Sequence, residues 1–127
     1  MRLEQNSEVL DPALALASVG GDPEFLREIA GLVHAAWPTL LGDIRGNLAA
    51  GNLPALKADA RLARVAAEYV SAGRAYVSAH LLETLAGQGD LVGAQRATAS
   101  LEEEVAKLQP ALYQIRNSGD IGGRPPS

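Results

Sequence analysis

The sequence predicts an all-α protein: an up-down antiparallel four-helix bundle with a short extra helix at its N-terminal end. Alanine and leucine, two strong helix formers, supply 23 and 19 of the 127 residues. Apolar residues recur at spacings of three and four along most of the chain, and no segment alternates as a strand would. The connections are short, so successive helices are expected to be antiparallel neighbours.

Two Asp-Pro pairs mark the first two helix starts, since aspartate caps free N–H groups and proline fits the first helical position. Asp11-Pro12 opens a short helix that ends at Gly20-Gly21, and Asp22-Pro23 opens a long helix to about residue 50. Pro38 lies inside the long helix and should kink it or remove a backbone hydrogen bond. The predicted core residues of this helix are Phe25, Ile29, Leu32, Val33, Ala36, Leu40, Ile44 and Leu48.

Three more helices follow, and Asn52 and Asp90 are predicted to cap two of them. Glycine endings are expected at Gly51 and around residues 87–89, with a further break at residues 71–73. The predicted core positions are Leu56, Ala60, Ala63, Ala67 and Val70, then Ala75, Ala79, Leu82 and Leu85, then Leu91, Ala94, Leu101, Val105, Leu108 and Leu112. Trp37 and the three tyrosines are predicted to pack in the core or at its edge.

Length and composition narrow the possible functions. The length fits one domain, with an N-terminal extension over residues 1–9, a bundle over 10–117 and a Gly/Pro-rich disordered tail over 118–127. No apolar run is long enough to cross a membrane, and no secretory signal pattern is present. The lack of cysteine fits a reducing compartment, so we expect a cytoplasmic protein with no membrane partner. A net charge of −4 argues against nucleic acid as a partner.

Residues that could carry chemistry are few. His34 and His80 fall on different predicted helices and have no companions at metal-ligand spacing. The consecutive carboxylates of residues 102–104 fan out over ~200° of a helix, so we interpret them as a solvated face. There is no phosphate-binding glycine loop after a strand and no Ser/His/Asp set. We therefore expect no enzymatic activity, no metal and no cofactor.

One basic feature stands out on the helix that follows Asn52. Lys57, Arg61 and Arg64 are spaced at i, i+4 and i+7, which places them in one stripe on an acidic chain. Asp59 and Glu68 lie on the same helix and are expected to neutralise part of this charge. An ordinary solvated helix face remains the alternative interpretation of the stripe.

Around this stripe the sequence resembles the histidine-phosphotransfer (HPt) domain of bacterial phosphorelays, over about residues 10–112. The resemblance covers the opening helices, the Gly-Asp turns, the element with Leu82-Glu83, and the final helix. It is carried by LDPALALASVGGDPEFLREIAGLV, AAWPTLLGDIRGNLAAGNLPALKADA, VSAGRAYVSAHLLETLAGQGD and SLEEEVAKLQPAL. The resemblance implies an HPt-like four-helix bundle.

The chemical motif of that family is an exposed histidine followed by lysine at +3 and glycine at +4. The resemblance places Arg61, Arg64 and Val65 at these three positions. A phosphoacceptor needs a free lone pair, which neutral imidazole has and the protonated guanidinium lacks. Val65 would also fill the space that glycine leaves for the phosphoryl group. The chain is therefore interpreted as a degenerate HPt-like member without its phosphoacceptor.

Three functions remain open. The first is a pseudo-HPt module that binds response-regulator receiver domains, or a histidine kinase, through Lys57, Arg61, Arg64, Val65 and Glu68. Receivers hold a cluster of carboxylates in their phosphorylation pocket, and a guanidinium can pair with carboxylates. The second is active phosphotransfer through His34 or His80. The third is a helical adaptor or dimerisation module outside phosphorelays, which allows for a weak homodimer.

Overall fold

The computed structural model describes residues 9–118 as an all-helical bundle, with no strand in that range. The helices are α2 (Pro12–Ser18), α3 (Pro23–Ala50), α4 (Leu53–Tyr69), α5 (Gly73–Gly87) and α6 (Leu91–Arg116). One short helix and four longer ones thus lie where the sequence predicted them. Apart from Val9 and Ser118, the predicted N-terminal extension and C-terminal tail lie outside the described residues.

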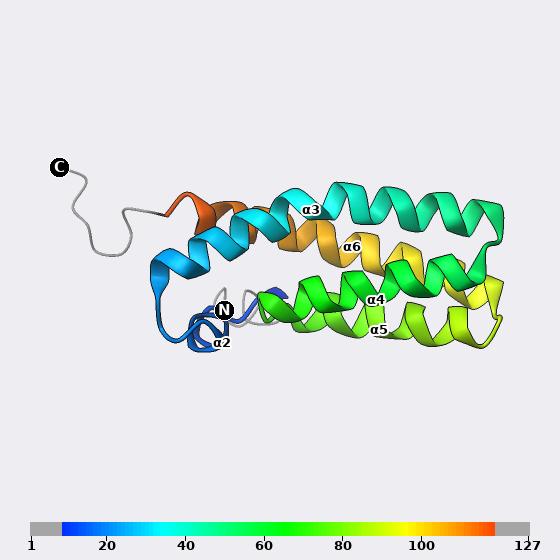
Figure 1. Cartoon of the computed structure of the whole chain (residues 1–127), viewed down its shortest axis with the longest axis horizontal. Helices are drawn as coiled ribbons and strands as arrows, with labels where there is room; N and C mark the ends of the chain where they lie inside the picture. The colour runs from blue at the N-terminus through cyan, green and yellow to red at the C-terminus, as the bar shows by residue number, and fades with distance from the viewer. Residues whose placement is uncertain (1–8, 119–127) are drawn as a thin grey trace.

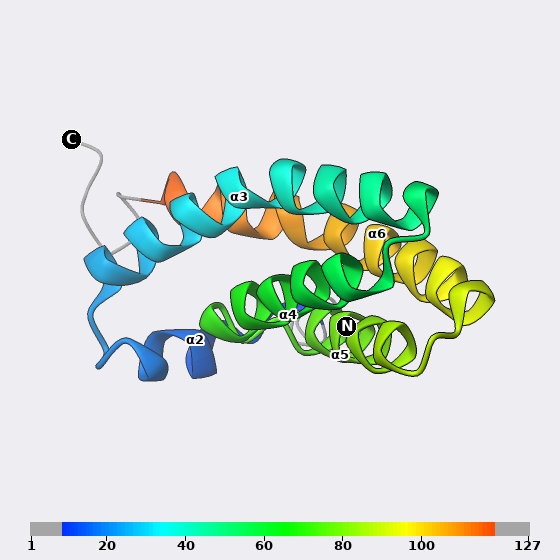
Figure 2. The same ribbon diagram turned by 45° about the vertical axis from the view of Figure 1, so that its right-hand side comes forward.

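The four long helices form two layers, with α3 and α6 in one and α4 and α5 in the other (Figures 1 and 2). α3 packs against α4 and α6, and α5 packs against the same two helices. Each long helix runs in the opposite direction to the one before it, and α2 lies near the start of α3 (Figure 1). Within residues 9–118, no helix combines enough length and apolar surface to cross a bilayer.

Side-chain caps begin four of these helices, as predicted. Asp11, Asp22, Asn52 and Asp90 each accept a hydrogen bond from a backbone N–H in the first turn, with the shortest at 2.8 Å between Asp90 Oδ1 and the Gly93 nitrogen. Gly51 ends α3 in the left-handed conformation, at φ 68°, where a side chain would be strained. The sequence signals for helix starts and stops are therefore confirmed.

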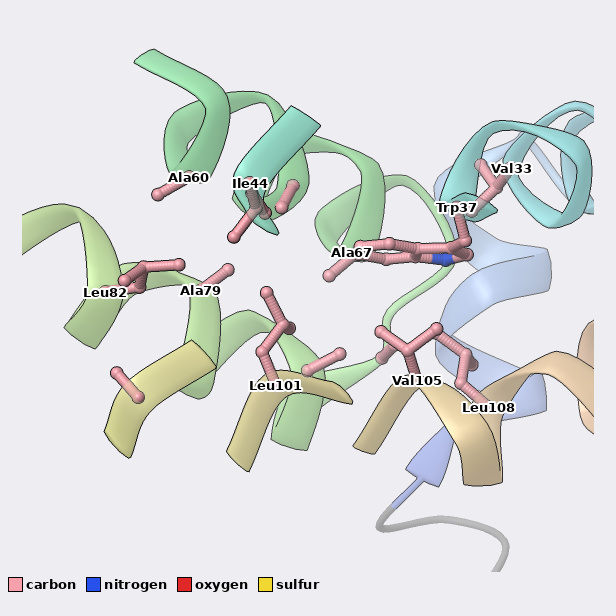
Figure 3. Packing of buried hydrophobic residues seen from close by; sticks show 14 of the residues in the cluster. Val33, Trp37, Ile44, Ala60, Ala67, Ala79, Leu82, Leu101, Val105 and Leu108 are labelled. Atoms are coloured by element: carbon pink, nitrogen blue, oxygen red, sulfur yellow. The ribbon is translucent and has the colours of Figure 1, made fainter. Parts of the chain in front are cut away.

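The core lies between the two layers, and α4 contributes small residues to it. All five predicted core positions of α4 and its end, from Leu56 to Val70, are fully buried. Three of them are alanines, which let α4 approach its neighbours closely. The Trp37 ring fills the space beside Ala67, and Leu101, Val105 and Leu108 of α6 complete the layer (Figure 3). The prediction that Trp37 packs in the core is confirmed.

The predicted core register is wrong at several positions near the helix starts. Phe25 and Leu32 are 45% and 67% exposed, because the buried stripe in the first half of α3 runs through Leu26, Ala30 and Trp37, beside the correctly predicted Val33. Both stripes satisfy the helical period, and the indole has the larger apolar surface to bury. Leu91, at the first position of α6, is 37% exposed. Tyr69 and Tyr113 are more than half exposed, which leaves their hydroxyl groups in water.

Pro38 does not interrupt α3, which continues through it. Proline has no N–H group, so the carbonyl of His34, four residues earlier, lacks its usual helical partner. The Gln109 side chain of α6 supplies the missing donor, with Nε2 3.0 Å from the His34 oxygen. The predicted loss of a backbone hydrogen bond at Pro38 is thus compensated from the neighbouring helix.

Candidate functional site

Helix α4 presents the basic stripe because its two sides differ in composition. Its alanine side is buried against the rest of the bundle, whereas Lys57 and Arg61 lie on the exposed side. Arg61 lies near the middle of the helix, away from both ends and from the Asn52 cap. The stripe predicted from the spacing therefore lies on an accessible face.

Arg61 is exposed and forms no hydrogen bond or ion pair with any residue between 9 and 118. Lys57, one turn earlier, also lacks an ion-pair partner in this range. Its side chain runs toward Gly87 of α5, where Cδ and Cε lie 3.5 Å from the position that a Cβ atom would take. Both cations are therefore available to groups from outside the described chain.

Arg64 differs from these two cations, because it bridges α4 to α5. Its Nε donates to Glu83 Oε1 at 2.7 Å, and only 21% and 15% of the two side chains are exposed. The hydrogen bond to Glu83, followed by one to Tyr76, raises the pKa of the Arg64 guanidinium above its ordinary value. Arg64 is thus already neutralised within the fold.

The acidic residues of α4 leave Lys57 and Arg61 unneutralised. Asp59 lies on the side of α4 that faces α3, where its Oδ2 accepts from Asn47 Nδ2 at 2.6 Å. Glu68 is exposed, with no ion pair to either cation. The expected partial neutralisation of the stripe therefore comes from Glu83 of α5, which the sequence of α4 alone could not indicate.

Val65 and Glu68 line an apolar groove beside the stripe, with a volume of about 430 Å³. Val65 is half-buried, so its side chain occupies the space next to the exposed face of α4. The groove is completed by the end of α2 and by α3, and its other lining residues are Ser18, Val19, Phe25, Ile29 and Tyr69. Sequence reasoning missed this groove because it placed Phe25 in the core and the tyrosines in the core or at its edge.

The two histidines lie apart, on α3 and α5. His80 is exposed, with Nδ1 4.0 Å from Glu83 Oε1, and its ring stacks on Tyr76 at a centroid distance of 6.2 Å. The His34 ring lies 5.9 Å from that of Tyr113. In the part of the chain that the structure describes, no three His, Cys, Asp or Glu side chains come together as metal ligands would.

The acidic run of α6 is not a purely solvated face, so that prediction is wrong for two of its three residues. Glu102 accepts from Nε and Nη2 of Arg45, with Nε–Oε2 at 2.6 Å, and Glu104 accepts from Arg74 at 3.2 Å. The hydrogen bonds from Arg45 lower the pKa of Glu102 below its ordinary value. Only Glu103 points fully into solvent.

The described residues define an all-helical bundle that presents two unpaired cations beside an apolar groove. Comparison with protein-family models, with curated proteins and with solved structures finds no match to this chain. Its function must therefore be inferred from the side chains of α4 and their neighbours.

Proposed function

We propose that this protein is a pseudo-HPt module: an HPt-like up-down bundle that binds response-regulator receiver domains without carrying phosphate. One observation carries the proposal. Arg61 is exposed on α4 and has no partner among residues 9–118, and it lies at the position where the resemblance requires the phosphoaccepting histidine. The helix packing supports the fold, because each long helix contacts two others and the chain reverses at each turn (Figure 2).

The chemistry of Arg61 favours binding over transfer. Its guanidinium stays protonated and has no lone pair with which to attack a phosphoryl group. It can instead donate two parallel hydrogen bonds to a carboxylate of a receiver's acidic pocket. Because Arg61 has no partner in the described chain, it can form these bonds without breaking any internal ion pair.

The surroundings of Arg61 are consistent with a docking surface. Lys57 adds a second cation on the same stripe, and the groove lined by Val65 offers apolar area beside the charge. Val65 also occupies the position at which the family has glycine. A receiver bound here would be held without losing phosphate to the module, so the protein would act as a decoy, adaptor or inhibitor.

Charge reversal at Arg61 tests the proposal. We expect Arg61→Glu to weaken binding of receivers from the same organism by about tenfold or more, since close interfacial charge pairs couple by roughly 1.5–7 kcal/mol. Arg96→Glu is the matched control, because Arg96 is exposed on α6 and also lacks an ion pair among residues 9–118. Equal binding of every receiver by wild type and Arg61→Glu in competition assays would contradict the proposal.

A gain-of-function experiment tests the relation to phosphotransfer. The double substitution Arg61→His with Val65→Gly supplies a nucleophilic imidazole and the space beside it. We expect the variant to accept phosphate from a phosphorylated receiver that wild type only binds. Failure of a folded, receiver-binding double variant to accept phosphate would show that the docking geometry differs from that of an HPt domain.

A second candidate function is phosphotransfer through His80, and the geometry around this residue favours it over His34. His80 is exposed, whereas His34 is only partly exposed, so a partner could reach the His80 ring more easily. Incubation with phosphorylated receiver should then give acid-labile, base-stable phosphate that His80→Gln abolishes and His34→Gln retains. Absence of label on wild type would exclude this candidate.

A further inference from the structure

Lys57 and Arg61 form a pair of neighbouring cations that no carboxylate neutralises within residues 9–118. The other cations in this range are either paired or separated from one another. Those in ion pairs are Arg27, Arg45, Arg64 and Arg74. Arg96, Lys107 and Arg116 are spaced nine or more residues apart along α6, so they do not share one turn of the helix.

Asp59 on the same helix and Glu83 on the neighbouring α5 are held by other side chains. Asp59 binds Asn47 on the side of α4 that faces α3, and Glu83 binds Arg64. Like charges at i and i+4 destabilise a helix, so the two charges of Lys57 and Arg61 do not stabilise the fold. An arrangement that the folded chain does not need indicates a binding role for the pair.

We propose that Lys57 and Arg61 together bind a phosphoryl group on the docked receiver, so that the phosphorylated receiver binds more tightly than the unphosphorylated form. This inference rests on the proposed function and specifies which state of the partner is recognised. A phosphoryl group carries a charge of about −1.5 to −2 and offers three acceptor oxygens. Two cations one helical turn apart match that charge, whereas a single carboxylate engages one of them.

The two side chains differ in how they can contact such a group. The Arg61 guanidinium is a planar fork that can donate to two phosphoryl oxygens, and the Lys57 ammonium is a mobile point charge that can reach a third. Neither protonated group has a lone pair, so the phosphoryl group stays on the partner. Phosphorylation of a carboxylate adds nearly one negative charge at the same place. We therefore expect about fivefold to tenfold tighter binding of the phosphorylated receiver.

The test compares the dissociation constants of one receiver in its phosphorylated and unphosphorylated forms, with the full chain as its partner. Lys57→Gln with Arg61→Gln should abolish the difference between the two forms. Arg96→Gln with Lys107→Gln removes the same charge from α6 and should retain it. Equal binding of both receiver forms by wild type would overturn the phosphoryl inference and leave the proposed function standing.

A second experiment, with a small molecule in place of the receiver, distinguishes the anion site from the proposed receiver binding. Acetyl phosphate, with acetate as its control, is titrated into the labelled protein while NMR signals of the lysine and arginine side chains are followed. We expect Lys57 and Arg61 to shift with acetyl phosphate more than Lys107 and Arg96 do. Selective shifts without binding of any receiver would contradict the proposed function but retain the anion site. Equal shifts at all four cations would overturn the site itself.

Discussion

Helices α4 and α6 each carry a run of like charges, and the two runs differ in what neutralises them. Glu102 and Glu104 of α6 pair with Arg45 and Arg74, which come from the helices on either side. Among the cations of α4, Arg64 alone has such a partner within residues 9–118, in Glu83 of α5. The charged side chains of α6 therefore serve the fold, whereas Lys57 and Arg61 remain open to other molecules.

The difference shows that a charge run cannot be interpreted from its own helix. Both runs lie on long amphipathic helices, and each can be interpreted from its own sequence as a solvated face. Their roles are decided by side chains on neighbouring helices that lie far away in sequence, such as Arg45, 57 residues from Glu102. Substitutions on α6 should therefore change stability, and substitutions on the open part of α4 should change binding.

The largest expected effect lies on the buried side of α6. Leu101 is fully buried, so Leu101→Ala leaves a cavity and should lower the free energy of unfolding by about 2–5 kcal/mol. Leu62→Ala, at a position of α4 that is 57% exposed, is the control and should change it by less than about 0.5 kcal/mol. Chemical denaturation measures both. If both variants lose the same unfolding free energy, Leu62 must be buried against a partner outside the bundle.

The next effect concerns the polar contact between α6 and α3. Gln109→Met leaves the His34 carbonyl without a donor, which should cost about 1 kcal/mol. In a Pro38→Ala background the helix regains its own N–H donor, so the same substitution should then cost less. Gln95→Met, at an exposed position of α6, controls for the change in side chain. A denaturation-based double-mutant cycle with no coupling would rule out compensation at Pro38.

A third, smaller effect should appear in binding. Glu83→Gln removes the ion-pair partner of Arg64 and leaves a third unneutralised charge on the stripe. Receiver binding should become about twofold to fivefold tighter, in line with the weak coupling of exposed charges. Glu103→Gln makes the same change in net charge at a carboxylate without an ion pair in the described chain. Receiver affinity is measured by calorimetry. Equal affinities of the two variants would mean that Arg64 takes no part in docking.

The fold was largely predictable from the sequence because its signals are local. Asp22, Asn52 and Asp90 cap the first turns that follow them, and Gly51 supplies the positive φ that ends α3. Helical spacing also identified the alanine stripe of α4, since three of its residues share one face. The register of α3 was less predictable, because two adjacent stripes satisfy the same period and the burial of Trp37 decides between them.

The candidate site was only half predictable. Spacing placed Lys57, Arg61 and Arg64 on one stripe, but the partner of Arg64 lies on another helix, 19 residues away. The groove depends on Phe25 and Tyr69 staying exposed, whereas the sequence predicted Phe25 in the core and Tyr69 in the core or at its edge. Contacts between helices depend on how the bundle closes, which a pattern along a single helix does not specify.

The smallest effect tests the ion pair that most clearly distinguishes α6 from α4. Because hydrogen bonds from Arg45 lower the pKa of Glu102 from 4.5, the pair stabilises the fold above that pH and is lost as the pH falls through the lowered value. Glu102→Gln should therefore reduce the free energy of unfolding by about 0.2–1 kcal/mol at neutral pH, because both side chains are partly exposed. The difference in unfolding free energy between wild type and Glu102→Gln should disappear in acid and become smaller in high salt. If this difference persists at pH values below the lowered pKa of Glu102, packing of the side chain, rather than its charge, joins α6 to α3.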